Sequence, residues 1–297
     1  MITITKDINA AKFVTHAGNF HADDVFATVF LEKLHGDITV IRLKNYIDDG
    51  TKITYDIGLG KFDHHQAGFD KKRENGIHYC GFGLLWKEFG LEYLNQIKVD
   101  DPKTTYEIFD YLLVNMIDAI DNGEFDIHAE FNVYTLSHLI ELFRPSFLNN
   151  DDEDECFKKA CEFASTIFDL VLKDSICKAA AMNIVKEKSK KMQNKILILD
   201  EMIPYEFAIF KLGLDVNFVI FPSNRGGYAS HTVPTFYRGF VPKIKFPEAW
   251  AGLRDEELAN VSNIPSARFC HNKRFLFTCD TFEDAIKAAE IASSNNS

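Results

Sequence analysis

The sequence lacks the cysteine pairs that mark small zinc and redox sites. Its 297 residues include six cysteines, and no two of them have the spacing Cys-x-x-Cys. Neither a zinc ribbon nor a thioredoxin-type site is therefore indicated. We expect the cysteines to be reduced thiols in a cytoplasmic protein.

Long apolar runs are missing as well. The opening residues 1–13 include Lys6 and Asp7 and lack the continuous apolar stretch of a signal peptide. No later segment approaches the roughly 20 apolar residues that cross a membrane. We therefore expect no membrane partner, and the sequence leaves open whether the protein forms a homo-oligomer.

Positive charge is scarce, since 33 Lys and Arg face 44 Asp and Glu and give a net charge of −11. Such a chain repels a polyanion at long range, which argues against a non-specific coat for nucleic acid. A local basic groove or bound metal ions can still receive a phosphate. The hydrophobic content of 46% supports a substantial core and, at this length, about two domains.

Short β-prone runs alternate with helical patterns in the first half of the chain. Residues 13–15, 38–43 and 53–57 are typical of strands, and the apolar spacing over 25–34 predicts a helix. This alternation favours a parallel sheet covered by helices, which places ligands at the carboxyl ends of its strands. His16 and Asp56 both fall at such ends.

The rest of the chain has a different pattern. Further helices are predicted at 82–94, 106–120 and 153–192, strands at 195–199, 215–221, 228–233 and 268–279, and a last helix at 280–292. The predicted class is α/β with two domains. A catalytic, parallel-sheet domain covers 1–150, a helical connector covers 151–194, and a smaller substrate-binding α/β domain with a mixed or antiparallel sheet covers 195–297.

Histidine and aspartate gather at the predicted strand ends and loops of the first half. The set comprises His16, His21, Asp23, Asp56, Asp63, His64, His65, Asp118 and Asp121. Imidazole and carboxylate without thiolate suit manganese, iron, zinc or magnesium. One carboxylate can also bridge two cations about 3.5–4 Å apart, which then activate water for phosphoryl displacement. Each residue alone has an ordinary explanation as a turn or cap residue, but together they predict a metal site.

Several short motifs resemble those of a known family. Asp63-His64-His65 resembles the triplet that names the DHH phosphoesterase superfamily. Within it, the melanocyte-proliferating-gene family of metal-dependent hydrolases is similar over nearly the whole chain. The further matches are Thr15-His16-x-Gly18-x-Phe20-His21-x-Asp23, Gly83-Leu84-x-Trp86, Asp118-Ala119-x-Asp121-Asn122-Gly123 and Trp250-x-Gly252-Leu253-Arg254-Asp255-Glu256. The resemblance implies that 1–150 is a DHH-like domain, although His21 stands where the wider superfamily has a carboxylate.

The resemblance also implies a cofactor and roles for individual residues. The cofactor would be two divalent metal ions, with manganese expected first and magnesium, iron or zinc as alternatives. Their ligands would be His16, His21, Asp23, Asp56, His64 and Asp121. Asp56 would bridge the two ions, His65 would face the substrate phosphate, and Asp63 would orient the histidine pair. Asp24 and Asp118 are interpreted mainly as helix-end residues.

Three residues of the C-terminal domain are candidates for substrate binding. Arg254 and His271 lie in or beside family-like motifs, and Arg225 precedes Gly226-Gly227. An arginine can pair with phosphate through two parallel hydrogen bonds. The alternatives are that Arg254 braces a helix start and that Arg225 belongs to an exposed hairpin turn.

The expected function is that of a metal-dependent phosphoesterase, a 3′→5′ exonuclease that acts on RNA or short oligonucleotides. One alternative with the same metals is a pyrophosphatase or nucleotide phosphatase, which needs several cations around a compact phosphate group. Another is a catalytically inactive, metal-stabilised binding protein. Metal-dependent hydrolysis of a phosphodiester would separate this last class from both enzymes.

Overall fold

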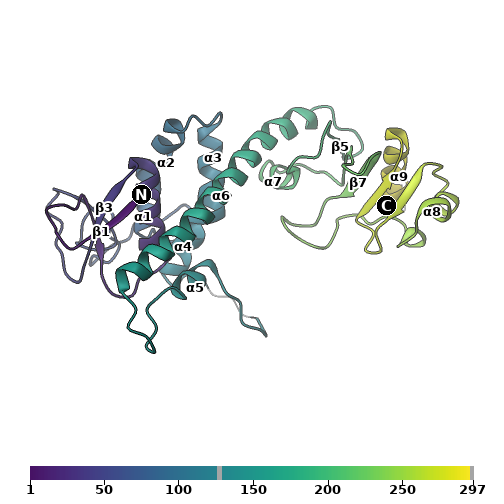
Figure 1. The fold of residues 1–297 in the computed structure, drawn as a ribbon. Helices are drawn as coiled ribbons and strands as arrows, with labels where there is room; N and C mark the ends of the chain where they lie inside the picture. Colours follow the sequence, from purple (N-terminus) through teal and green to yellow (C-terminus); the bar gives the residue numbers. More distant parts are fainter. Residues whose placement is uncertain (126–128, 295–297) are drawn as a thin grey trace. The chain divides into compact units, whose positions relative to one another are not determined.

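The computed structural model describes residues 1–125 and 129–294, which form two compact units, Met1–Ile176 and Cys177–Ser297. Each unit contains one sheet and its helices (Figure 1). The first sheet is parallel and the second is mixed, so the predicted two-part α/β class is confirmed. The division of the chain at 1–150, 151–194 and 195–297 stays a prediction, because compactness does not establish which parts fold alone.

The sheet of the first unit has four strands in the order β1-β3-β2-β4. They are β1 (Ile2–Thr5), β2 (Phe13–His16), β3 (Ile38–Leu43) and β4 (Ile53–Thr54). β2 and β4 are parallel neighbours, with Val14 opposite Thr54. Continuing this register by two residues brings the chain at His16 level with the chain at Asp56, so both emerge from the same edge of the sheet.

Helix α1 (Ala22–His35) lies at the centre of this unit (Figure 1). Eleven of its 14 residues are buried, because the helix packs against β3, α2 (Gly81–Gln96), α4 (Asn115–Asp121) and α5 (Leu136–Glu141). Phe26 and Phe30 from α1 meet Phe82 and Trp86 from α2 in an aromatic core. Burial extends to the first turn of α1, where Asp23 and Asp24 are fully enclosed.

The helix predicted at 106–120 is divided in the structure. It comprises α3 (Pro102–Phe109), a π-helical turn (Asp110–Val114) and α4. Side-chain periodicity does not distinguish a π turn from the α-helix around it, and such turns are frequent near functional sites. This turn directly precedes the helix that ends at Asp121.

Helix α6 (Glu153–Ser189) is continuous through the boundary between the two units. Phe157 and Phe168 from its first part are buried in the core of the first unit, whereas Val185 near its end is buried in the second. A single helix of 37 residues therefore contributes to two separate cores.

The second unit has a five-stranded sheet in the order β5-β6-β7-β9-β8. Its strands are β5 (Ile196–Ile198), β6 (Phe218–Pro222), β7 (Tyr228–Thr232), β8 (Ala267–Cys270) and β9 (Leu276–Cys279). Only β5 and β6 are parallel, and the other pairs are antiparallel. The run predicted as strand at 268–279 is thus two strands joined by a turn. The helices are α7 (Tyr205–Lys211), α8 (Asp255–Ser262), α9 (Phe282–Ser294) and a short 3₁₀ turn at Glu248–Trp250.

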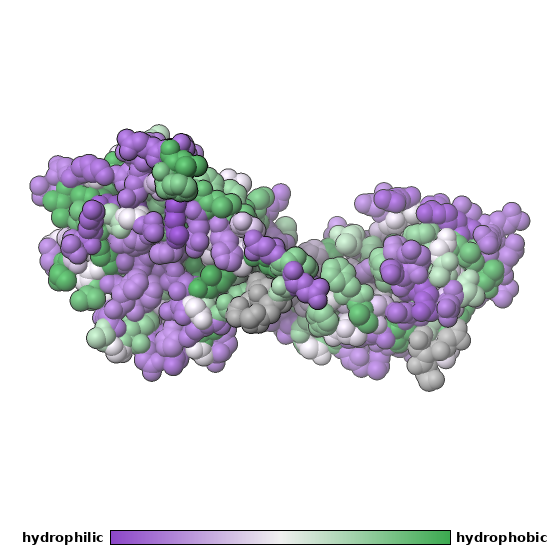
Figure 2. Space-filling model, turned by 90° about the horizontal axis from the view of Figure 1, so that it is seen from below, coloured by the Kyte–Doolittle hydropathy of each residue, from purple (hydrophilic) through white to green (hydrophobic). Residues whose placement is uncertain are grey.

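The face of the molecule drawn in Figure 2 is mixed in character. On the face seen in Figure 2, hydrophilic and hydrophobic residues alternate over each unit. Among the described residues, no helix combines the length and the apolar composition required to cross a membrane.

Candidate metal centre

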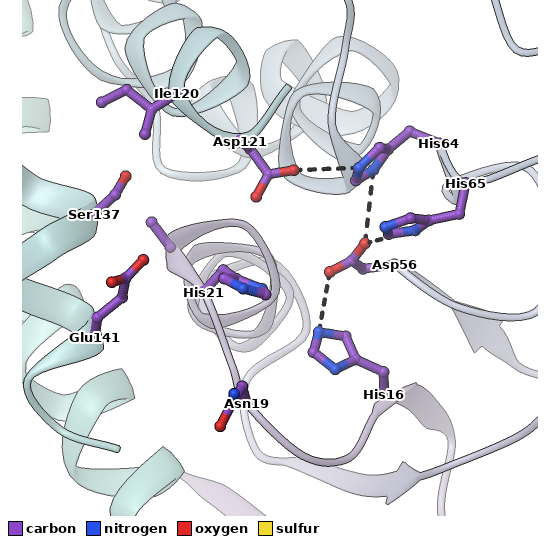
Figure 3. A pocket seen from close by; sticks show the side chains of 11 residues that line it. His16, Asn19, His21, Asp56, His64, His65, Ile120, Asp121, Ser137 and Glu141 are labelled. Carbon is purple, nitrogen blue, oxygen red and sulfur yellow. Dashed lines mark ion pairs between the residues drawn. The ribbon is translucent and has the colours of Figure 1, made fainter. Parts of the chain in front are cut away.

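The candidate site forms where β2 and β4 end. His16 closes β2, and Asp56 follows β4 with a left-handed backbone (φ 54°), which turns the chain away from the sheet. Nε2 of His16 lies 3.2 Å from Oδ2 of Asp56 (Figure 3). A left-handed conformation is uncommon for residues other than glycine, and strain of this kind clusters at functional sites.

The first turn of α1 supplies two more carboxylates. Oδ2 of Asp24 lies 3.3 Å from Nε2 of His16, and Oδ1 of Asp24 accepts a hydrogen bond of 2.7 Å from the backbone N–H of His21. Asp23 accepts hydrogen bonds from the backbone N–H groups of Gly81 and Phe82. These N–H groups belong to the first turn of α2, whose positive dipole end favours a buried anion.

His64 connects the remaining acids. Its Nε2 lies 3.2 Å from Oδ2 of Asp121, and its Nδ1 lies 3.6 Å from Oδ1 of Asp56 and 3.7 Å from Oδ2 of Asp23. Figure 3 shows the side chains of His64 and Asp121 pointing toward each other at one side of the pocket, with Asp56 next to His64. Residues from the end of α4, the start of α1 and the loop after β4 therefore converge on one point.

Asp63 and His65 form a pair within the Asp-His-His triplet. Oδ1 of Asp63 accepts hydrogen bonds from the backbone N–H of His65 (2.9 Å) and from its Nδ1 (3.0 Å), and Oδ2 accepts one from the N–H of Leu59 (2.7 Å). Burial opposes ionisation of Asp63, but these hydrogen bonds outweigh it and lower its pKa to about 2. Asp63 is thus an anion that fixes the loop, while the side chain of His65 is 60% exposed.

The side chains form three overlapping groups whose candidate ligand atoms lie within 4.8 Å of one another. Asp56 belongs to two of the groups and His64 also belongs to two. The groups are Asp56, Asp63, His64 and His65; His16, Asp24 and Asp56; and Asp23, His64 and Asp121. Shared members are what two neighbouring cations with a bridging ligand require.

Burial shifts the pKa values of the aspartates and of the histidines in opposite directions, because it disfavours the charged form of each. Burial raises the pKa of Asp24 to about 7, and it raises the pKa of Asp23 well above its usual value with help from the charges of Asp56 and Asp121. Burial alone would lower the pKa of His16, but its hydrogen bond with Asp56 and the charges of Asp24 and Asp56 raise it to about 9. The cluster therefore has more negative charge than its own groups neutralise.

The donor atoms fit metal ions. Three buried atoms of this cluster lack a hydrogen-bond partner among the described residues, namely Oδ2 of Asp24, Oδ1 of Asp56 and Nδ1 of His64. An unpaired buried carboxylate oxygen is costly, so such atoms are normally satisfied by a partner or an ion. Oxygen and imidazole nitrogen form a donor set that suits manganese, iron, zinc or magnesium.

The structure distinguishes between the predicted ligands. It brings His16, Asp23, Asp56, His64 and Asp121 into the three groups, whereas His21 lines the same pocket outside them, with its ring centroid 6.1 Å from that of His16. Burial and the charge of Arg144 lower the pKa of His21, which keeps its imidazole in the neutral form that a metal needs. As a ligand, His21 stays a prediction.

Asp24 is the residue that sequence reasoning underrated. An acid in the first turn of a helix usually faces solvent, and the local sequence favours this interpretation for Asp24. The signal that could have identified it is the apolar run from Val25 to Leu31, which only Thr28 interrupts and which predicts a helix buried on all sides. Asp118, interpreted in the same way, is also buried, but it accepts hydrogen bonds from Cys80 and Arg73 instead of joining the ligand groups.

The three substrate-binding candidates lie in the second unit. Arg254 precedes α8, and its guanidinium lies 4.4 Å from the centroid of the Phe269 ring. His271 follows β8, with its ring centroid 4.2 Å from that of Phe275. Arg225 is exposed in the turn between β6 and β7. Their part in substrate binding stays a prediction.

Fold and site together define an α/β protein with a candidate metal centre at the carboxyl ends of a parallel sheet. Residues 12–292 match the family model MYG1_exonuc, which is described as "Uncharacterised protein family (UPF0160)". The chain belongs to this family. The resemblance to the melanocyte-proliferating-gene family is thus confirmed.

Relatives match along both units. The MYG1 protein of Schizosaccharomyces pombe is 28% identical over 316 residues, which cover 96% of this chain and 98% of that protein. The MYG1 protein of Chlamydia muridarum is 29% identical over 296 residues, covering 93% and 94%. The MYG1 exonuclease of Homo sapiens is 25% identical over 319 residues, covering 93% and 84%. No solved structure matched this chain.

Proposed function

We propose that this protein is a metal-dependent phosphodiesterase that removes nucleotides from RNA or short oligonucleotides in the 3′→5′ direction. The observation that carries the proposal is the convergence of carboxylates and imidazoles around Asp56 and His64, with three of their buried atoms lacking a hydrogen-bond partner. The name of the human relative supports nuclease-like hydrolysis at a coarse level.

Two sets of residues would hold the metal ions. His16, Asp24 and Asp56, with His21 beside them, would form one set, and Asp23, Asp56, His64 and Asp121 the other. When bound, the ions would supply a water of lowered pKa and a positive charge for the phosphate oxygens. No serine or cysteine nucleophile is then required.

The chain's own groups would orient the substrate. His65 is the exposed member of the centre, and its Nδ1 lies 3.3 Å from Oδ1 of Asp56 and 3.0 Å from Oδ1 of Asp63. The hydrogen bond that Asp63 accepts from Nδ1 of His65 raises the pKa of this histidine, so the imidazole is more often the protonated cation that pairs with an anionic phosphate oxygen. Asp63 is the positioning residue for this imidazole.

The second unit is suited to holding the rest of a polyanionic substrate. Residues 177–297 carry 16 Lys and Arg against 13 Asp and Glu, a net charge of +3, whereas residues 1–176 carry 17 against 31, a net charge of −14. The net −11 of the whole chain therefore conceals a positive second unit. We assign phosphate binding to Arg254 and His271, with Arg225 as a further contact.

The small number of lysine and arginine side chains at the site favours a phosphodiester substrate over a compact, highly charged phosphate. The two cavities that meet at Asp56 are lined by one lysine, Lys44, and by no arginine among the described residues. Pyrophosphate and nucleoside triphosphates carry several negative charges in a small volume and need more cationic side chains than one lysine. We therefore place the phosphodiester ahead of pyrophosphate as substrate.

One comparison tests the proposal. Manganese-loaded protein is incubated in parallel with labelled RNA, single-stranded DNA, dinucleotides and pyrophosphate, and the products are separated. We expect RNA and dinucleotides to be cleaved, with His64→Ala and Asp56→Ala each losing this activity while the fold persists by circular dichroism. His35→Ala, an exposed histidine at the end of α1, is the matched control and should stay active. Cleavage of pyrophosphate alone, or full activity of purified Asp56→Ala, would overturn the proposal.

A further inference from the structure

A second cavity of about 550 Å³ adjoins the candidate metal centre. Asp56 and His65 line both this cavity and the pocket of about 440 Å³ shown in Figure 3. Each volume lies within the roughly 300–1,000 Å³ of small-ligand sites. The centre is therefore bordered by two spaces, each large enough for one nucleoside.

The second cavity lies between the loops that follow β3 and β4, the strands on either side of β2. Lys44 to Ile47 follow β3, and Asp56 to Leu59 follow β4. The loops are joined by a hydrogen bond of 2.9 Å from the backbone N–H of Asp48 to the carbonyl oxygen of Gly58. This link holds the cavity walls at a fixed separation.

Glycine is required where the loops meet. Gly58 has φ +91°, and a β-carbon there would lie 2.9 Å from Cγ2 of Thr54 and 3.4 Å from Cδ1 of Tyr46. Tyr46 also packs against the buried Val14 and Ile41 of the sheet, so its ring is held from behind. The wall of the cavity is thus preformed and includes an aromatic ring.

The lining of the second cavity differs from that of the first. Its exposed apolar side chains are Ile47 (69% exposed) and Leu59 (55% exposed). Ile57 and the ring of Tyr46 also line it. Its polar side chains away from the metal centre are those of Lys44 and Asn45, and Lys44 makes no ion pair with the described residues. The first cavity is instead lined by Asn19, His21, Ser137 and Glu141.

We propose that the second cavity binds a nucleoside that flanks the scissile phosphate, with its base against Tyr46, Ile47 and Leu59. A phosphodiester has two ester arms, and a phosphate at Asp56 and His65 would direct one arm into each cavity. Stacking on an aromatic ring accepts any base, because every base has a π face. Lys44 and Asn45 would contact the polar edge of this nucleotide or its next phosphate. The inference rests on the proposed function and names its minimal substrate, a dinucleotide.

The test compares an intact dinucleotide with an analogue in which one base is replaced by hydrogen on the sugar. Each of the two positions is modified in turn. For the parent protein, we expect kcat/KM to fall about tenfold when the base in the second cavity is missing. Tyr46→Ala and the exposed variant Ile47→Ser should reduce kcat/KM for the intact dinucleotide, mainly through KM, and leave the base-free analogue unchanged. Tyr111→Ala, an exposed tyrosine of the same unit, serves as the control.

A second measurement needs neither metal nor turnover. Adenosine without phosphate is added to the full chain in the presence of EDTA, and its binding is followed by saturation-transfer NMR. We expect a transfer signal that Ile47→Ser weakens and Tyr111→Ala leaves intact. If dinucleotides are cleaved but neither base removal nor these variants changes kcat/KM, the nucleoside site is wrong and the proposed function survives. If adenosine binds and no phosphodiester is cleaved, the proposed function fails instead.

Discussion

A β-carbon on Gly83 would lie 2.2 Å from Oδ1 of Asp118, so the two residues leave no room for any side chain at position 83. Gly83 is in the first turn of α2, and the Asp118 carboxylate accepts hydrogen bonds from the N–H and Sγ of Cys80 just before this helix. Arg73 donates to the same carboxylate. The close contact holds α2 against α4 beneath the metal centre.

We therefore expect Gly83→Ala to displace Asp118 and destabilise the protein. Overpacking of a full core costs about 1–3 kcal/mol, and that range is the expected loss in the free energy of unfolding. Urea unfolding followed by circular dichroism measures it. Leu91→Ala, at a position 44% exposed on the same helix, should lose much less. Equal losses for both variants would contradict the contact.

The metal-free protein should lose stability as the pH rises. The folded protein raises the pKa of His16 and of His64 from 6.5 to about 9, since hydrogen bonds and charges from neighbouring aspartates outweigh burial. The stability that a raised histidine pKa contributes is fully present below pH 6.5 and is lost as the pH rises to about 9. We expect the Tm measured in EDTA to fall over this window. Burial raises the pKa of Asp24 from 3.8 to about 7, so this residue also lowers the stability of the folded protein as the pH rises through that range.

Manganese should reverse that dependence. A metal ion needs neutral imidazoles, so its binding displaces the protons of His16 and His64 and becomes stronger from pH 6.5 to 9. Calorimetric titration in buffers of different ionisation enthalpy should show proton release. A Tm in EDTA that is constant from pH 6 to 9.5 would show that the imidazoles are not protonated in the metal-free protein.

Activity should be higher with manganese than with magnesium. Magnesium prefers oxygen ligands and water, whereas the groups around Asp56 include the imidazoles of His16 and His64. Rates are compared at saturating concentrations of each ion, with free metal removed first by chelation. Equal or faster turnover with magnesium would mean that fewer histidines bind metal than we propose.

Arg254→Ala should raise KM strongly for an oligonucleotide and leave metal content unchanged, because it removes a charge-assisted contact to phosphate. The effect should shrink at high salt, where the contact is already screened in the parent protein. Arg254→Lys should recover only part of the loss, because an ammonium cannot form the paired hydrogen bonds of a guanidinium. If Arg254→Ala lowers Tm with unchanged kinetics, Arg254 only braces α8 through its contact with Phe269.

Much of the architecture followed from local patterns. Alternating β-prone and helical segments predict a parallel sheet, and the rule that ligands bind at strand ends places His16 and Asp56 together from the sequence alone. Both are local properties, since a strand end can be read from the residues around it. The α/β class was predicted correctly for this reason, whereas the family was predicted from the resemblance of short motifs such as Asp63-His64-His65.

The environment of Asp24 could not be read in the same way. Whether a first-turn aspartate faces solvent or a ligand depends on α2, α4 and α5, which cover α1 from distant parts of the sequence. The second cavity had no sequence signal either, because it exists only when the loops after β3 and β4 are side by side. Such features belong to tertiary packing and not to any segment alone.

The continuity of helix α6 bears on how the two units can be exchanged between genes. Its first part completes one core and its last part enters another, so a genetic exchange between the units would cut a helix that both need. We expect either unit, if cut within α6, to lose buried residues from its core. The relatives from Schizosaccharomyces pombe, Chlamydia muridarum and Homo sapiens match 93% to 96% of this chain, a share that includes residues of both units.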